Sequence, residues 1–243
     1  MKKLFFLLVM AVSLQGFSTP EKNRQVNTGT TPSFLLADSI KQKLDKLVKQ
    51  IATADSCRVM VKVVHNGEVY NSGYDGRKNS IITDFSNPVE IGSCSKLFTA
   101  AAIHQLIEQK KISLHTRLTD IMPNPKLYKD LLVVDGVDYI DSVRIVNLLN
   151  HTSGFADYFM KDADNELAVH GDSTLRFTPV QLINLAKRLK NPAFKTNSKW
   201  GYSNVNYILL GMIIEKLSGM KYQQYIQKNI LQPLALNTLI LAR

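Results

Sequence analysis

The sequence predicts an α/β protein of the α+β kind, with a small antiparallel sheet followed by a long helical region. Three observations predict it: an amphipathic helical pattern, then two β-rich runs joined by Asn66-Gly67, then mainly helical or irregular chain to the C-terminus. The composition is 45% hydrophobic and 21% charged, which is ordinary for a globular protein. The length leaves room for one sizeable core or a domain plus a subdomain.

The N-terminal segment has the pattern of a secretory signal. A pair of lysines precedes an apolar run, Leu4 to Leu14, and small and polar residues follow it. The run is too short to span a bilayer comfortably, so we expect a cleavable signal peptide over residues 1–18, with a retained membrane anchor as the alternative. Residues 19–38 are polar and indicate a flexible tether, which leaves a folded domain over residues 39–243. The expected location is periplasmic or secreted, with no stable membrane span after cleavage.

The folded domain should begin with a helix and a β-hairpin. Apolar residues at three- and four-residue spacing predict a helix from about Ile40 to Thr53, capped by Asp38-Ser39. The dipeptide Asn-Gly at the centre of the next segment is the strongest short hairpin signal, so Arg58–His65 and Glu68–Tyr74 should pair antiparallel. A lone hairpin is not a stable sheet, so it needs a partner.

Helical patterns dominate the rest of the chain. A helix should follow Lys96, and a short helix with a glycine turn should follow near residues 143–155. Thr178 and Pro179 are a helix cap and a first helical residue. Gly219 should close the helix that begins near Asn204.

Several classes of function receive no support from the sequence. Cys57 and Cys94 form no disulfide framework; a single bridge stays open, but two small buried residues are the favoured interpretation. The net charge of +10 comes from scattered lysines, which indicates a solvated basic surface or attraction toward anionic substrates or an anionic envelope surface. No nucleic-acid motif or metal-ligand spacing is present, so we expect no nucleic-acid partner, no metal and no cofactor.

The segment "IGSCSKLFTA" raises the question of a nucleophile. Ser93 precedes Lys96 by one helical turn at the predicted start of a helix, so the lysine amine can reach the serine hydroxyl. A second match, Ser218 and Lys221, lies at a helix C-terminus, where the helix dipole opposes an oxyanion. A capping serine followed by a surface lysine is the alternative for the first pair.

The segment "KWGYSNVNYILLG" supplies two further candidates. Tyr202 and Asn204 are two positions apart, so both side chains point the same way if the backbone there is extended. A core tyrosine and a turn asparagine are the alternative, and neither segment decides the matter by itself.

Together these segments carry a resemblance. The chain resembles the serine β-lactamase and DD-peptidase superfamily, and within it the class C-like branch of β-lactamases, D-alanyl-D-alanine carboxypeptidases and related esterases. "IGSCSKLFTAAAIHQLIEQKKISL" is similar to the nucleophile helix of that branch, "VRIVNLLNHTSGF" to its "LLxHTSG" signature, and "WGYSNVNYILLG" to its Tyr-x-Asn region. The resemblance covers roughly residues 40–243. It implies an antiparallel sheet flanked by helices, with an all-helical subdomain.

The resemblance also implies roles for individual residues. Ser93 would be the acylated nucleophile and its backbone N–H would supply half of the oxyanion hole. Lys96 would help to deprotonate it, Tyr202 would be the general base, and Asn204 would orient the substrate amide and the lysine. The implied substrates are β-lactams, D-Ala-D-Ala peptides or small esters, and the protein is expected to be a monomer.

The chain departs from the family pattern in two respects. Residues 194–199 read Phe-Lys-Thr-Asn-Ser-Lys, where the family usually has Pro-Gly before its Tyr-x-Asn. The third family motif, Lys-Thr-Gly or His-x-Gly on a strand, is absent, and Thr238–Leu241 is the one later strand candidate. We therefore expect an incomplete sheet that lacks its C-terminal strands, as in a truncated relative, and weak or no hydrolysis by this chain. A non-catalytic binding or remnant domain of the same fold is the alternative function.

Overall fold

The computed structural model describes two compact parts of the chain. They are Met1–Gly92 and Ser93–Arg243, called here unit 1 and unit 2. The predicted signal peptide and nearly all of the predicted tether lie outside the described residues, which are 36–86, 88–122, 124–158, 177–188, 194–236 and 239. Within these ranges, no helix has the length and apolar character needed to cross a membrane.

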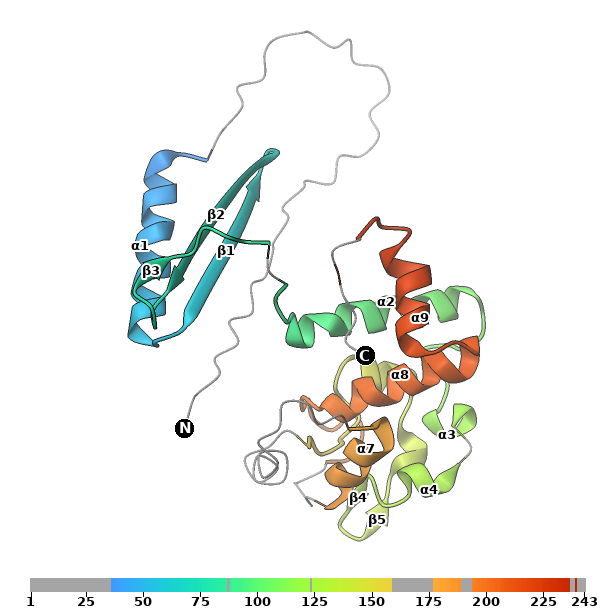
Figure 1. The fold of residues 1–243 in the computed structure, drawn as a ribbon. Coiled ribbons are helices and arrows are strands. Elements are labelled where there is room, and N and C mark those ends of the chain that lie inside the picture. The colour runs from blue at the N-terminus through green and yellow to red at the C-terminus, as the bar shows by residue number, and fades with distance from the viewer. Residues whose placement is uncertain are drawn as a thin grey trace, which may run out of the picture. The chain divides into compact units, whose positions relative to one another are not determined.

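Unit 1 consists of one helix and a small antiparallel sheet (Figure 1). Its elements in chain order are α1 (Asp38–Ala54), β1 (Arg58–His65), β2 (Glu68–Asp75) and β3 (Ser80–Ile81), with sheet order β1-β2-β3. The predicted hairpin is confirmed, with His65 opposite Glu68. Asn66 and Gly67 both have positive φ, at 48° and 83°, as the tight turn requires.

The helix α1 packs against β1 and β2, and residues of the helix and of the two strands together form a small core. That core contains Val48 and Ala52 from the helix and Val59 and Tyr74 from the strands. Asp45 on the same helix accepts hydrogen bonds from two hydroxyls of β2. The hairpin is thus stabilised by a helix on its face and by only two residue pairs with β3.

One expectation for unit 1 was wrong, and one for the C-terminal segment is not tested. The helix begins at Asp38, after Ala37, and no side-chain cap is formed, so Asp38 lies in the first turn and does not cap it. A carboxylate there still interacts favourably with the helix N-terminus. The strand expected over Thr238–Leu241 lies almost entirely outside the described residues, and Leu239, the described one, is not in a strand.

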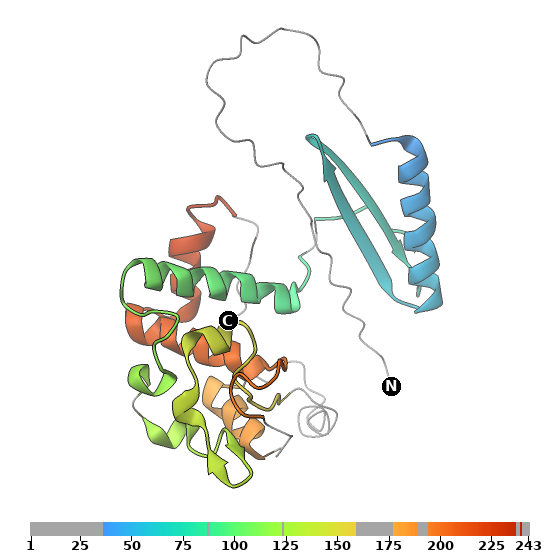
Figure 2. The same cartoon turned by 180° about the vertical axis from the view of Figure 1, so that it is seen from behind.

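Unit 2 is mainly helical and is built around α8, the Asn204–Ser218 helix (Figure 2). This helix packs against α2, α5, α7 and α9. The other elements are η1 (Gly92–Ser95), α2 (Lys96–Glu108), α3 (Leu118–Ile121), α4 (Pro125–Tyr128), β4 (Val133–Val134), β5 (Val137–Asp138), η2 (Ile140–Ser142), α5 (Ile145–Leu149), α7 (Pro179–Arg188), α9 (Tyr222–Ile226) and the π-helical turn η3 (Gln227–Leu231).

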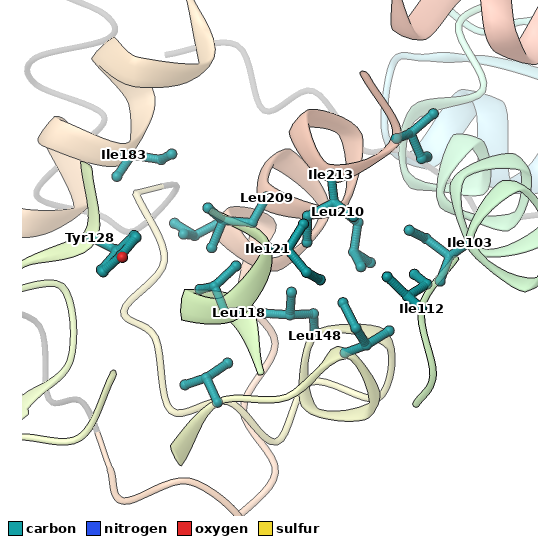
Figure 3. Close-up of a cluster of buried hydrophobic side chains, with 14 of the residues drawn as sticks. Ile103, Ile112, Leu118, Ile121, Tyr128, Leu148, Ile183, Leu209, Leu210 and Ile213 are labelled. Carbon is teal, nitrogen blue, oxygen red and sulfur yellow. The ribbon is translucent and has the colours of Figure 1, made fainter. Parts of the chain in front are cut away.

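A continuous apolar core joins these helices (Figure 3). Leu209, Leu210 and Ile213 of α8 are fully buried, and Ile103 of α2 and Leu148 of α5 are buried in the same cluster. Side chains of this size contribute on the order of 1.5–3 kcal/mol each when removed from water. The core therefore fixes where the first residues of α2 and α8 lie.

The local signals for the helix ends are confirmed. Thr178 and Gln181 exchange hydrogen bonds between side chain and backbone at the start of α7. Gly219 ends α8 in the left-handed conformation, with φ 70°. The short hairpin β4–β5 was not expected, although Asp135-Gly136 at its turn has positive φ at both residues.

The cysteines differ from the expectation of two buried residues. Cys57 is half-buried against the core of unit 1, whereas Cys94 is exposed, and both are free thiols. Cys94 lies in the turn η1 before α2, which directs it to solvent instead of into the helical core.

Candidate active site

Ser93 and Lys96 lie at the start of α2. Ser93 belongs to the 3-10 turn η1, and Lys96 is the first residue of the α-helix. This tight turn brings Lys96 Nζ to 3.3 Å from Ser93 Oγ, where it donates a hydrogen bond. Ser93 is exposed and Lys96 is half-buried, so the hydroxyl is accessible while the amine is partly shielded from water.

Tyr202 and Asn204 approach this pair from the start of α8. Ser203 between them is extended, with φ −145° and ψ 128°, so both side chains lie on the same side of the backbone. The phenol oxygen of Tyr202 lies 2.7 Å from Ser93 Oγ. Asn204 Oδ1 accepts hydrogen bonds from Lys96 Nζ at 2.8 Å and from the Tyr202 hydroxyl at 3.3 Å. The structure thus brings together all four side chains that the sequence singled out.

Two aromatic rings face the lysine. Lys96 Nζ lies 5.1 Å from the ring centroid of Tyr202 and 5.5 Å from that of Tyr207. Ring faces attract a cation at this range, by about 0.5–1 kcal/mol or more where water is excluded. The rings therefore add to the hydrogen bond from Asn204 in holding the ammonium group beside Ser93.

His151 supports the phenol from behind. Its ring is stacked on that of Tyr202, with centroids 4.6 Å apart and planes at 27°. His151 Nδ1 accepts a hydrogen bond from the Ser203 backbone N–H at 3.2 Å, which requires a lone pair on that nitrogen. Burial lowers the pKa of His151, and the nearby charge of Lys96 lowers it further, against the opposing effect of Asp157.

The segment around His151 is tightly fixed. His151 itself has φ 60°, and Gly154 has φ 93°. A Cβ atom on Gly154 would lie 1.9 Å from the carbonyl oxygen of Phe194, so only glycine fits. Ser153 is fully buried and donates to Asn206 Oδ1 at 2.6 Å, which gives its hydroxyl a structural partner.

Asp157 is a site residue that sequence reasoning missed. Its carboxylate is 8% exposed and accepts hydrogen bonds from the Asn204 backbone N–H at 3.2 Å and from Asn204 Nδ2 at 3.1 and 3.2 Å. The one signal for it in the sequence is an acidic residue three positions after Gly154, in a segment that is otherwise small and aromatic. Its partner is 47 residues away, so no local pattern identifies it.

The four side chains form a chemically recognisable set. An exposed hydroxyl has an amine and a phenol within hydrogen-bonding distance, and each of these groups can exchange a proton with it. Both helices that present the set begin at the site, so their partial positive charges favour negative charge there. Among the described residues, no group of three or more His, Cys, Asp or Glu side chains is placed to hold a metal ion.

This fold is that of the serine β-lactamase and DD-peptidase superfamily. The chain belongs to the Beta-lactamase family, whose model matches residues 44–241. The family thus supports hydrolase activity of the serine β-lactamase or peptidase type.

Curated relatives include penicillin-binding and peptidase proteins. The chain is 33% identical to penicillin-binding protein 4* of Bacillus subtilis over 156 residues, which is 61% of this chain and 29% of the relative. It is 25% identical to a putative D-alanyl-D-alanine carboxypeptidase of Salmonella agona, over 94% of this chain and 53% of the relative. The chain thus spans about half or less of the length of these two relatives.

Two solved structures of the same fold show the likeness at more than 25% identity. An octameric penicillin-binding protein homologue from Pyrococcus abyssi has a TM-score of 0.61 and 29% identity, over 83% of this chain and 44% of that one. A class C beta-lactamase in complex with cefoxitin has a TM-score of 0.59 and 26% identity, over 83% of this chain and 51% of that one. Because one of these neighbours is an octamer, the expectation of a monomer finds no support in them.

Proposed function

We propose that this chain is a serine hydrolase of the β-lactamase and D-Ala-D-Ala carboxypeptidase type, which forms an acyl-enzyme through Ser93. The observation that carries the proposal is the contact of Ser93 Oγ with both Lys96 Nζ, at 3.3 Å, and the Tyr202 phenol, at 2.7 Å. A serine hydroxyl is a weak nucleophile unless a neighbouring base removes its proton, and this hydroxyl has two candidate bases.

In the proposed acylation, Ser93 Oγ attacks the carbonyl carbon of an amide, lactam or ester. The hydroxyl proton passes to Tyr202, which acts in its deprotonated, phenolate form. The bond from the carbonyl carbon to the leaving group then breaks, and Tyr202 delivers the proton to the leaving nitrogen or oxygen and is a phenolate again. Lys96 stabilises the negative charge that develops on the oxygens beside it. Water activated by Tyr202 then cleaves the Ser93 ester and restores the free hydroxyl.

Two further roles follow from the position of the site at helix starts. The backbone N–H of Ser93 is proposed as one donor to the oxyanion, since the start of α2 directs N–H groups and positive partial charge toward it. Asn204 is proposed to orient the substrate amide as well as Lys96, whose ammonium it already holds.

The proposed substrates are β-lactams, D-Ala-D-Ala peptides or small esters. The names of the relatives, a penicillin-binding protein and a putative D-alanyl-D-alanine carboxypeptidase, support the first two classes. The same nucleophile serves all three classes, because each presents a carbonyl carbon with a leaving group. Formation of the acyl adduct at Ser93 and its later hydrolysis therefore have to be measured separately for each substrate class.

The direct test is reaction of the full chain with a fluorescent penicillin. Intact mass spectrometry should show one adduct, and peptide mapping should place it on Ser93. Ser93→Ala should abolish it, and Ser218→Ala, in the other Ser-x-x-Lys segment, should leave it unchanged. A folded chain that forms no adduct and cleaves no D-Ala-D-Ala peptide or ester would contradict the proposal and favour a non-catalytic binding domain. The decay rate of the adduct tests the expectation of weak hydrolysis.

We also propose that the protein is exported. The support is the sequence pattern of residues 1–18 together with the kinds of relative found. Expression of the full chain in a bacterium with a periplasm should give a mature N-terminus close to residue 18. An intact N-terminus in the cytoplasmic fraction would contradict this proposal.

A further inference from the structure

Asp157 is a buried carboxylate to which the proposed mechanism gives no role. It accepts hydrogen bonds from Asn204 through the backbone N–H and the side-chain Nδ2. Burying a charge is costly unless hydrogen bonds compensate for it. The start of α8 also favours negative charge there. The carboxylate is thus well placed at the back of the site, on the far side of Asn204 from Lys96.

The side-chain amide of Asn204 has two unlike ends, and Asp157 determines which way they face. A carboxylate accepts hydrogen bonds only, so the NH₂ end of the amide has to face Asp157. The Oδ1 end then faces Lys96 at 2.8 Å and the Tyr202 hydroxyl at 3.3 Å. A flipped amide would place its oxygen against the carboxylate and its N–H groups against the ammonium, and both contacts would be repulsive.

This orientation sets the direction of the remaining hydrogen bonds. Because Asn204 Oδ1 accepts from Tyr202, the phenol proton points to Asn204 and a lone pair of the phenol oxygen is left for the Ser93 hydroxyl proton, across 2.7 Å. In the flipped arrangement the phenol would accept from Asn204 instead, and its proton would point to Ser93. In the resting site the first direction leaves the Ser93 hydroxyl donating to the phenol oxygen, and the second would reverse that contact. The phenol has to give up its own proton before it can take the one from Ser93.

We infer that Asp157 is a positioning residue that holds the Asn204 amide in one orientation and thereby directs the hydrogen bonds among Lys96, Tyr202 and Ser93. The catalytic part of this inference rests on the proposed acyl transfer at Ser93, whereas the orientation of the amide does not. Two measurements test the orientation of the amide and its effect on catalysis separately.

The first measurement is independent of any reaction. In the full chain, the side-chain NH₂ resonances of Asn204 are assigned in a ¹H–¹⁵N spectrum by their loss in Asn204→Ala. They should exchange slowly with water. Asp157→Asn should raise their exchange about tenfold or more, the factor expected when a hydrogen bond to a charged group is lost. Fast exchange in the wild type, or exchange unaffected by Asp157→Asn, would overturn the inference whether or not penicillin reacts.

The second measurement is a double-mutant cycle on the rate of Ser93 acylation. Asp157→Asn places an NH₂ group against the NH₂ of Asn204, and should lower the rate about 10- to 100-fold through misplacement. In the Asn204→Ala background the same change should lower it by less than about twofold, since a residue that acts through Asn204 has nothing left to position. An equal loss in both backgrounds would show a structural role and overturn the inference.

A matched control addresses stability. Tyr222→Phe removes another partly buried hydrogen bond of unit 2, between Tyr222 and Thr99, and should leave both the Asn204 amide exchange and the acylation rate unchanged. If the wild type forms no adduct, the proposed function fails, and the amide exchange still decides whether Asp157 orients Asn204.

Discussion

The imidazole of His151 lies stacked on the phenol ring of Tyr202, 4.6 Å between centroids, while its Nδ1 binds the backbone N–H of Ser203, the next residue along. One histidine thus fixes both the ring plane of the proposed base and the extended backbone that presents it. The neutral ring is required, because a protonated Nδ1 cannot accept the Ser203 hydrogen bond.

The state of His151 predicts a pH dependence of stability. Burial lowers its pKa below the usual 6.5, so on acidification the unfolded chain takes up a proton first. The stabilisation should be fully present above about pH 6.5, the pKa in the unfolded chain, and be lost as the pH falls from there through the lower pKa of the folded state. Urea unfolding followed by the fluorescence of Trp200, the single tryptophan, should therefore give a lower midpoint at pH 5.5 than at pH 7.5.

Replacement variants test whether His151 causes this pH dependence of stability. His151→Asn keeps a residue that tolerates the left-handed backbone at this position, with φ 60°, and should reduce the difference between the two pH values. His115→Asn, at an exposed histidine of the same unit, should leave the difference as in the wild type. An unchanged difference in His151→Asn would show that other groups cause it.

Tyr202→Phe should separate the phenol oxygen from the ring. The ring and its stacking on His151 stay, while the contact with Ser93 Oγ is lost. Acylation by a fluorescent penicillin should fall by about 10²- to 10⁴-fold, the usual range for loss of a general base. Tyr222→Phe also loses a phenol hydroxyl and should react like the wild type. A rate for Tyr202→Phe within a few-fold of the wild type would exclude the phenol as the base.

Lys96→Arg should distinguish the charge of the lysine from its ability to exchange a proton. Arginine keeps the positive charge but does not give up a proton in proteins. Its planar group also fits poorly between Ser93 and Asn204, which hold the lysine amine from two sides. We expect acylation to fall at least about tenfold, as for the loss of a positioned proton-transfer group. Full activity in Lys96→Arg would show that the charge alone suffices.

Gly154→Ala should disrupt the segment behind the site. The new Cβ would meet the Phe194 carbonyl at 1.9 Å, in addition to the strain of a positive φ. We expect a loss of more than about 3 kcal/mol in the free energy of unfolding, measured by urea titration of Trp200 fluorescence. Gly136→Ala is the matched control: φ is also positive, at 77°, but nothing lies near the added atom, so only about 1–2 kcal/mol should be lost. Equal losses of unfolding free energy in the two variants would show that the structure around residue 154 shifts enough to remove the clash.

Features of the fold that depend on a few residues adjacent in the sequence could be predicted from the sequence. The turn at Asn66-Gly67, the cap at Thr178 and the end of α8 at Gly219 each arise from two to four adjacent residues. The hairpin turn at Asp135-Gly136 carried the same kind of signal and was overlooked, because the paired segments on each side are only two residues long.

Within the candidate site too, some residues could be predicted from the sequence and others could not. The Ser93–Lys96 spacing and the Tyr202–Asn204 spacing are visible in the sequence, and a family resemblance connects them. Asp157 could not be predicted, because its place beside Asn204 depends on how a loop of unit 2 folds onto the start of α8. The exposure of Cys94 likewise follows from the 3-10 turn before α2, which a continuous helix pattern does not reveal.

The contact between Ser93 and Tyr202 joins residues 109 positions apart, whereas Ser93 and Lys96 are held together by a single turn. The packing of α2 against α8 helps to maintain the first contact. Heating, denaturant or a core mutation that loosens these two helices should thus separate serine from phenol while the serine–lysine pair survives. Reactivity at Ser93 would then disappear before the helices themselves unfold. The loss of this reactivity would therefore report the first loosening of the core against which both helices pack.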